Sequence, residues 1–111
     1  MNSKIRFFSF KDIAPHSSGK KVDAFPLITS ELSETFGMNF SVFKNSTIDW
    51  TVTYDEALHC VEGEIDIIIE GKSHVLGPRD SIWIPAGTSL TYRADTATVL
   101  AIYSPVDPLS R

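Results

Sequence analysis

The sequence predicts an all-β protein folded as one antiparallel sandwich or barrel. Apolar and polar residues alternate over short segments, as where Ile48, Trp50 and Val52 alternate with Asp49 and Thr51. This period of two is typical of half-buried strands. Glycine and proline turn signals recur about every ten residues, a spacing typical of sandwiches and barrels. No segment has the period of an amphipathic helix, and 111 residues are enough for one core.

The first third of the chain is irregular. Residues 5–10 have the composition of a short strand, residues 14–20 are typical of a loop, and residues 29–34 can form one helical turn at most. Strands are expected from residue 36 onward, at 36–42, 48–54, 57–61, 65–69, 73–76, 81–84, 89–93 and 98–103. Pro105 and Pro108 then stop further pairing. The expected divisions are an N-terminal arm at 1–35, a barrel at 36–104 and a loose tail at 105–111.

The charge and cysteine content exclude several classes of function. The formal charge is −4 and no basic patch stands out, so we expect neither nucleic acid nor an anionic membrane as a partner. Cys60 is the single cysteine, which rules out an intramolecular disulfide and disfavours a thiolate metal cluster. No apolar run approaches the ~18 residues of a membrane span. We therefore expect a cytoplasmic protein.

Two motifs resemble those of the cupin superfamily. Glu56, followed after six residues by Gly63, resembles the end of the first cupin motif. Residues 79–87, Arg-Asp-Ser-Ile-Trp-Ile-Pro-Ala-Gly, resemble the second motif, in which glycine-aspartate precedes a strand and isoleucine-proline-x-glycine. The resemblance covers residues 36–104 and implies the antiparallel double-stranded β-helix, or jelly-roll barrel, of cupins.

The usual metal ligands of that superfamily are mostly missing. Catalytic cupins carry two histidines and a glutamate in the first motif and a third histidine in the second, a donor set suited to iron or manganese. By this resemblance the three histidine positions hold Trp50, Val52 and Leu90. A spacer longer by one residue would instead put Asp49 and Thr51 at the first two positions. Glu56 alone remains, so we expect no transition-metal site and no tightly bound cofactor.

A narrower resemblance lies in residues 49–56, Asp-Trp-Thr-Val-Thr-Tyr-Asp-Glu. They are similar to the Trp-Thr-x-x-Tyr-Asp-Glu stretch of EutQ, the ethanolamine-utilisation cupin, and residues 61–64 and 84–89 also match it. EutQ-type proteins lack the metal histidines too. The resemblance implies a setting in ethanolamine breakdown in bacterial microcompartments. It also implies an acetate kinase activity, which would involve ATP, Mg²⁺ and acetate.

Glu56 is the centre of the candidate site. An apolar and aromatic environment would raise its pKa and let it exchange protons near neutral pH. The candidate catalytic residues are Glu56, Tyr54 and Asp55, and the candidate ligand-binding residues are Trp50, Val52, Leu90 and Tyr92. A structural interpretation stands beside this one, in which the carboxylate is hydrogen-bonded at the barrel mouth and the aromatic residues are ordinary core.

Two functions are compatible with these residues. One is an enzyme acting on a small amine or acid. The other is a non-catalytic module that binds a small molecule or assembles with other proteins, and the loss of the metal ligands favours it. The chain has no Gly-x-x-x-x-Gly-Lys-Ser/Thr loop that would hold the phosphates of a nucleotide.

A homodimer is the expected assembly. Cupins of this kind usually dimerise, and Ile68 interrupts the alternation between Asp66 and Glu70. An apolar side chain facing outward there would suit a subunit interface. Residues 5–10 offer a second contact, because an extended segment can add to a partner's sheet.

Overall fold

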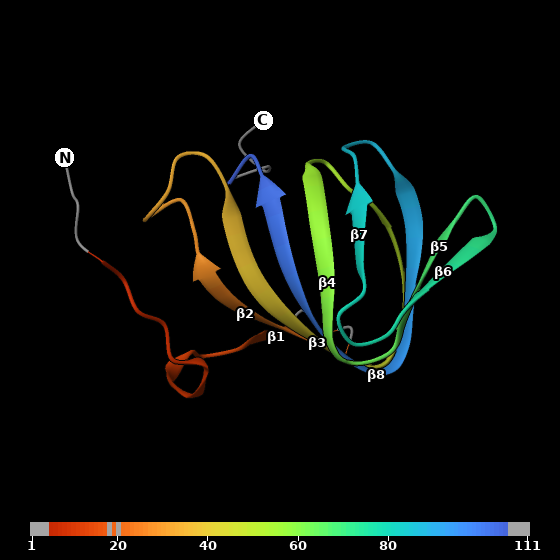
Figure 1. Cartoon of the computed structure of the whole chain (residues 1–111), viewed down its shortest axis with the longest axis horizontal. Coiled ribbons are helices and arrows are strands. Elements are labelled where there is room, and N and C mark those ends of the chain that lie inside the picture. The colour runs from red at the N-terminus through yellow and green to blue at the C-terminus, as the bar shows by residue number, and fades with distance from the viewer. Residues whose placement is uncertain (1–4, 18, 20, 107–111) are drawn as a thin grey trace.

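All strands of the described chain join one antiparallel sheet that curls on itself (Figure 1). The structure is a computed structural model that describes residues 5–17, 19 and 21–106. The elements in chain order are η1 (Phe10–Asp12), β1 (His16–Ser17), β2 (Val22–Ile28), β3 (Gly37–Thr51), β4 (Asp55–Gly63), β5 (Ile65–Ile69), β6 (Lys72–Leu76), β7 (Ser81–Ile84) and β8 (Ser89–Ser104). The all-β prediction is confirmed. Within the described residues, no helix is long and apolar enough to cross a membrane.

The strands are ordered β1-β2-β3-β8-β4-β7, and β5 pairs with β6 and with β8. The central pair is β3 with β8, whose register runs from Gly37↔Tyr103 to Thr51↔Ser89. The β5–β6 hairpin projects from one side of the body in Figure 1. Other strands pair with the β3–β8 ladder along both halves of its length: β2 pairs with the first half of β3, β5 with the first half of β8, and β4 with the second half of β8. The sheet therefore closes around an interior that is lined by both halves of β3 and β8.

Near the middle of each long strand, the face whose side chains point inward changes from one side of the strand to the other. On β3, Phe43 and Ser46 are both buried although they are three residues apart, and Asn45 between them has a left-handed φ of 45°. On β8, Ala94 and Ala97 are both buried at the same spacing. On β3 the left-handed Asn45 redirects the pleat. Each of the two strands lines two walls of the barrel, and from the sequence each was expected as two separate strands.

The N-terminal segment does not form the strand expected at residues 5–10. Residues 5–9 have no regular secondary structure, and the short helix η1 follows. The Phe10 ring packs on the outside of the sheet, with its centroid 4.7 Å from that of Phe25 and 5.4 Å from that of Phe40. These residues anchor the chain to the barrel through aromatic contact and not through a backbone ladder.

The sheet begins before residue 36, where the barrel was expected to start. β1 lies inside the expected loop at 14–20, and β2 pairs with β3 from Val22↔Phe43 onward. Pro26 obscured β2 in the sequence. Proline is tolerated there because β1 pairs only with Asp23 and Ala24, which leaves Pro26 at a free strand edge. Of the tail expected to be loose, Val106 is buried, and residues 107–111 lie outside the described part of the chain.

The largest fully buried side chains of the core are Ile65, Ile67, Ile84, Val52, Val99 and Cys60. Burying each large aliphatic side chain stabilises the fold by roughly 1.5–3 kcal/mol. Ser46 and Glu56 are the buried polar residues of the described chain. The Ser46 hydroxyl lies 3.0 Å and 2.9 Å from the carbonyl oxygens of Lys21 and Lys44. Glu56 is therefore the ionisable group in the interior that needs a separate explanation.

Candidate functional site

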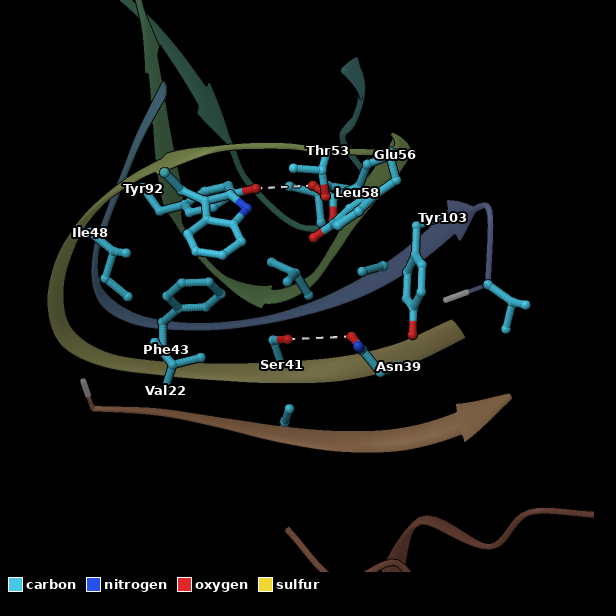
Figure 2. Close-up of a pocket in the computed structure, with 16 residues that line it drawn as sticks. Val22, Asn39, Ser41, Phe43, Ile48, Thr53, Glu56, Leu58, Tyr92 and Tyr103 are labelled. Atoms are coloured by element: carbon cyan, nitrogen blue, oxygen red, sulfur yellow. Dashed lines mark hydrogen bonds between the residues drawn. The ribbon is translucent and has the colours of Figure 1, made fainter. Parts of the chain in front are cut away.

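A cavity of about 640 Å³ occupies the interior of the curled sheet. It is lined by side chains from β2, β3, β4 and β8 and from the chain just before β4 and after β8, namely Val22, Ala24, Asn39, Ser41, Phe43, Ile48, Trp50, Thr53, Tyr54, Glu56, Leu58, Tyr92, Val99, Ala101, Tyr103 and Val106. Figure 2 shows Tyr92 and Glu56 on one side of this space and Phe43, Ser41 and Asn39 on the β3 side. The change of face on β3 and β8 is what allows residues of both halves to reach it.

Glu56 is the buried carboxyl group of the cavity. It is the second residue of β4 and is only 4% exposed. Its backbone pairs with Tyr103 on β8 and with Ile84 on β7, so its direction is fixed by neighbours on both sides. The Tyr92 hydroxyl donates a hydrogen bond of 2.9 Å to Oε1 of Glu56, drawn as a dashed line in Figure 2. The carboxyl group is thus held at one end of an otherwise mostly apolar space.

Burial sets the protonation of this group. Desolvation raises the pKa of Glu56 from 4.5 to about 7, although hydrogen bonds from Tyr92 and Tyr54 act in the opposite direction. Burial, followed by the nearby Glu56 charge, raises the pKa of Tyr54 to about 12. The same two causes raise the pKa of Tyr92. Near neutral pH both phenols therefore keep their protons, while Glu56 exchanges between its two forms.

The cavity holds no positive counter-charge for Glu56. None of the described residues that line it is a lysine, an arginine or a histidine. The other polar side chains at its surface are neutral, and they include Asn39, Ser41 and Thr53. An ionised carboxylate in such surroundings is costly unless a ligand or a proton neutralises it.

The structure brings four of the seven sequence-predicted site residues together. Trp50, Tyr54, Glu56 and Tyr92 all line the cavity, and Trp50, at 45% exposed, lies where the cavity meets solvent. The other three do not line it. Val52 and Leu90 are part of the hydrophobic core, and the Asp55 side chain is exposed and accepts a hydrogen bond of 2.9 Å from the Ala86 backbone N–H.

Several cavity residues were not predicted from the sequence, among them Asn39, Ser41, Phe43 and Tyr103. The alternation of apolar and polar residues over 36–42 favours the apolar side chains as the inward ones. The structure turns Asn39 and Ser41 inward instead, and Phe40 faces outward against Phe10. The available signal was the pair of small polar residues at alternate positions, because a ligand site needs a few polar groups on an apolar wall.

The donor set does not suit a transition metal. Of the alternative positions, Asp49 and Thr51 point away from the cavity, where they bind Thr91 and Ser89 across the β3–β8 ladder at 2.6 Å and 2.8 Å. The cavity side of the same strand presents Trp50. Glu56 is then the single carboxylate with two phenols nearby, and iron or manganese needs more oxygen or nitrogen donors than this. Among the described residues no group of three or more His, Cys, Asp or Glu side chains could hold an ion.

The curled antiparallel sheet with its internal cavity has the fold of the cupins, as the likeness to solved structures shows. A solved RmlC-like cupin from Shewanella frigidimarina NCIMB 400 has a TM-score of 0.80 with this chain at 17% identity, over 95% of each chain. Within the cupins, the sequence matches the family described as "Ethanolamine utilisation protein EutQ" over residues 3–107. The chain belongs to the EutQ family, as residues 49–56 indicated.

A solved EutQ structure and a curated EutQ sequence show the extent of the likeness. The structure of the Clostridium difficile EutQ protein has a TM-score of 0.76 and 31% identity, over 81% of this chain and 66% of that one. The acetate kinase EutQ of Clostridioides difficile (strain 630) is 33% identical over 82 residues, which are 73% of this chain and 52% of the relative. The chain thus spans about half the length of that relative.

Proposed function

We propose that this chain is a small-molecule-binding member of the EutQ family, and that its ligand occupies the cavity with a polar group against Glu56. The observation that carries the proposal is a buried carboxyl group, hydrogen-bonded to Tyr92, at one end of an apolar cavity. Keeping a carboxyl group there costs folding free energy. A purely structural role would be filled at lower cost by an apolar side chain.

The size and lining of the cavity support a compact ligand. A volume of about 640 Å³ lies within the range of roughly 300–1,000 Å³ found for small-molecule sites. Much of the cavity wall is apolar, with Phe43, Ile48 and Val99 among its residues. Asn39, Ser41 and Thr53 add neutral hydrogen-bonding groups. The proposed ligand is therefore partly apolar and has one polar end.

An enzymatic step at this site would be a proton transfer. Glu56 has a pKa of about 7, which suits a general acid or base at neutral pH. Tyr54 and Tyr92 would donate hydrogen bonds to the reacting group, since their raised pKa values keep them protonated. Asp55 would act only indirectly, by holding the loop at Ala86.

Acetate kinase activity is the second candidate, favoured by the name of the curated relatives. It would require ATP and Mg²⁺ as well as acetate, and so a place for several negative charges. The cavity supplies one carboxylate and, among its described residues, no cationic side chain. Incubation with ATP, Mg²⁺ and acetate, with acetyl phosphate trapped by hydroxylamine, tests this candidate. We expect no product above that of the Glu56→Gln variant.

A cavity-filling substitution tests the proposed binding function. Ser41 lines the cavity, whereas the next residue, Val42, lies on the other face of β3. Ser41→Phe should fill the space and abolish the thermal shift given by any ligand found in a metabolite screen, because a ligand that binds only the native state raises its stability. Val42→Phe is the matched control and should keep the full shift. A ligand that stabilises both variants equally would contradict the proposal.

We also propose a homodimer formed through an apolar surface on the outer face of the sheet. This surface, the outer patch, consists of the exposed Trp83 and Ile102 and the half-buried Met38, Phe40 and Leu100. Backbone pairing through Ala57 joins Met38, Ile102 and Trp83 into one row across four strands. A second copy of the chain suits this surface, because a two-fold contact sets like residues near each other and the outer patch has no charged side chain to repel its own image. Ile68 lies on the outward side of β5, as expected, opposite Ser73.

The proposed location is the cytoplasm. Its support is the single cysteine, Cys60, which is buried as a free thiol and so needs no oxidising compartment.

A further inference from the structure

The charge of the proposed ligand follows from the residues that face Glu56, and the inference rests on the proposed binding function. Tyr92 contacts the carboxyl group from β8, Tyr54 approaches it from the chain just before β4, and Tyr103 is its neighbour across the β4–β8 ladder. All three are neutral phenols near pH 7. No described residue that lines the cavity carries a positive charge, so the negative charge of Glu56 is open to a partner from outside the chain.

Aromatic rings stand on both sides of this carboxyl group. Phe43 and Tyr92 form one pair, with ring centroids 5.8 Å apart, and Tyr54 and Tyr103 form another at 5.2 Å. Tyr92 of the first pair donates a hydrogen bond to Glu56, and Tyr54 of the second pair lies near the same carboxyl group. Trp50 adds a fifth aromatic side chain at the cavity surface. Figure 2 shows the labelled rings of Phe43, Tyr92 and Tyr103 arranged around the same space as Glu56.

We propose that the cavity selects a small organic cation, with a primary or quaternary ammonium group bound between the two aromatic pairs and against the Glu56 carboxylate. The negative faces of aromatic rings attract cations, more strongly where water is excluded. The carboxylate supplies a full charge in a medium of low polarity, where an ion pair is stronger than in water. An anion such as acetate meets repulsion at the same place, and a neutral molecule of the same shape gains only the apolar contact.

The pH dependence of binding follows from the same arrangement. Only the ionised form of Glu56 pairs with a cation, and its pKa is about 7. The ionised fraction is then about one tenth at pH 6 and about nine tenths at pH 8. A permanently charged ligand should bind roughly tenfold more weakly at pH 6 than at pH 8.

Calorimetric titration with a pair of probes of equal shape tests the inference. Choline carries a quaternary nitrogen, and 3,3-dimethyl-1-butanol has a neutral carbon at that place. Propylammonium serves as a smaller cation and acetate as an anion. We expect a cation to bind the wild-type protein at pH 8 at least tenfold more tightly than the neutral alcohol and acetate, and roughly tenfold more weakly at pH 6. Glu56→Gln, which keeps the shape and removes the charge, should bring the affinities of choline and the alcohol together.

Different results contradict the choice of a cation and the use of the cavity as a binding site. Tighter binding of the alcohol or acetate, blocked by Ser41→Phe, would overturn the choice of a cation and leave the cavity as the binding site. Choline binding that survives both Ser41→Phe and Glu56→Gln would overturn the cation proposal and the proposed binding site together. Absence of binding by choline and by propylammonium up to 10 millimolar would overturn the cation proposal. Because the wild-type pH profile needs no variant, the test remains decisive even if a variant fails to fold.

Discussion

The two faces of the β3–β8–β4–β7 part of the sheet differ in what their side chains meet. The inward face encloses a cavity and holds polar groups, among them Asn39, Ser41 and the buried Glu56. The outward face carries large apolar side chains, and Trp83 there is 63% exposed. In an ordinary half-exposed sheet the apolar residues face inward and the polar ones face water. Here a few polar groups lie among the apolar residues of the inward face, and large apolar side chains lie on the outward face. This difference supports the two proposals, a ligand at the inner face and a second protein surface at the outer patch.

The largest expected difference is in the free energy of unfolding, between substitutions at two neighbouring residues of β5. Ile67 is fully buried, while Ile68 points to the outer side of the same strand. Ile67→Ala should reduce the free energy of unfolding by about 2–5 kcal/mol, because it leaves a cavity in the core. Ile68→Ala should reduce it by less than about 1 kcal/mol. Urea denaturation measures both, and equal losses would show that the assignment of the two faces on β5 is wrong.

The buried carboxyl group gives the next effect, and it depends on pH. Glu56 has a pKa of about 7 in the folded protein against 4.5 ordinarily, so the folded state holds the proton more tightly than the unfolded state. The wild-type protein should therefore be most stable below about pH 4.5 as far as this group is concerned, and should lose that stability as pH rises through 7. The difference corresponds to about 3 kcal/mol at full effect.

Glu56→Gln isolates this contribution. The amide oxygen can still accept the Tyr92 hydroxyl, but the variant has no charge to bury. At pH 8 it should be more stable than the wild type, by an amount on the order of 3 kcal/mol, and the difference should shrink steadily toward pH 5. Unfolding curves at several pH values measure it. A variant that is less stable at pH 8 would show that the carboxylate is satisfied within the fold.

The outer patch should respond to a charge placed at Trp83, its most exposed residue. Trp83→Lys should weaken the proposed dimer by at least about 2 kcal/mol, roughly thirtyfold in the dissociation constant. Val75→Lys is the control, because Val75 is also exposed, at 56%, but lies on β6 away from the patch. Light scattering over a concentration series measures the mass. A wild-type protein that is monomeric at micromolar concentration would contradict the dimer itself.

The smallest expected effect is that of metal removal. With Glu56 as the single carboxylate in the cavity, we expect elemental analysis of the purified protein to show no stoichiometric iron, manganese, zinc or nickel. Treatment with a chelator should leave the unfolding curve unchanged, because a metal that binds the native state would raise its stability. About one metal ion per chain, lost together with stability, would contradict this expectation.

The sequence predicted the fold from local patterns, and the errors lie where tertiary contacts decide. Strands at 65–69 and 81–84 were placed at the bounds that the structure shows, since each has clear turn signals on both sides. The long strands were split because the inward face changes near the middle of each without ending the strand, at Asn45 on β3 and between Ala94 and Ala97 on β8. β2 was missed because Pro26 resembles a strand breaker and only its position at a free edge makes it acceptable.

The candidate site was predictable where it followed the cupin resemblance. Trp50 and Glu56 line the cavity at positions that the motif implied, and Tyr54 and Tyr92 line it from nearby positions. The far wall was not predictable, because Asn39 and Ser41 became cavity residues only through the pairing of β3 with β2 and β8. Val52 and Leu90 share the inward side of their strands with the cavity residues, but neighbouring side chains enclose them in the core. Alternation identifies the side of a strand, and it does not distinguish core from cavity.

The titration of Glu56 itself tests the central claim most directly. Carbon-13 NMR of protein labelled at the glutamate carboxyl carbons follows each group, and Glu56→Gln assigns the signal by its disappearance. The account predicts a titration midpoint near pH 7 in the free protein, as burial of this carboxyl group requires. Saturating choline should lower the midpoint, because a bound cation favours the ionised form. A midpoint near the ordinary 4.5, or one that no organic cation moves, would contradict a cavity organised around this charge.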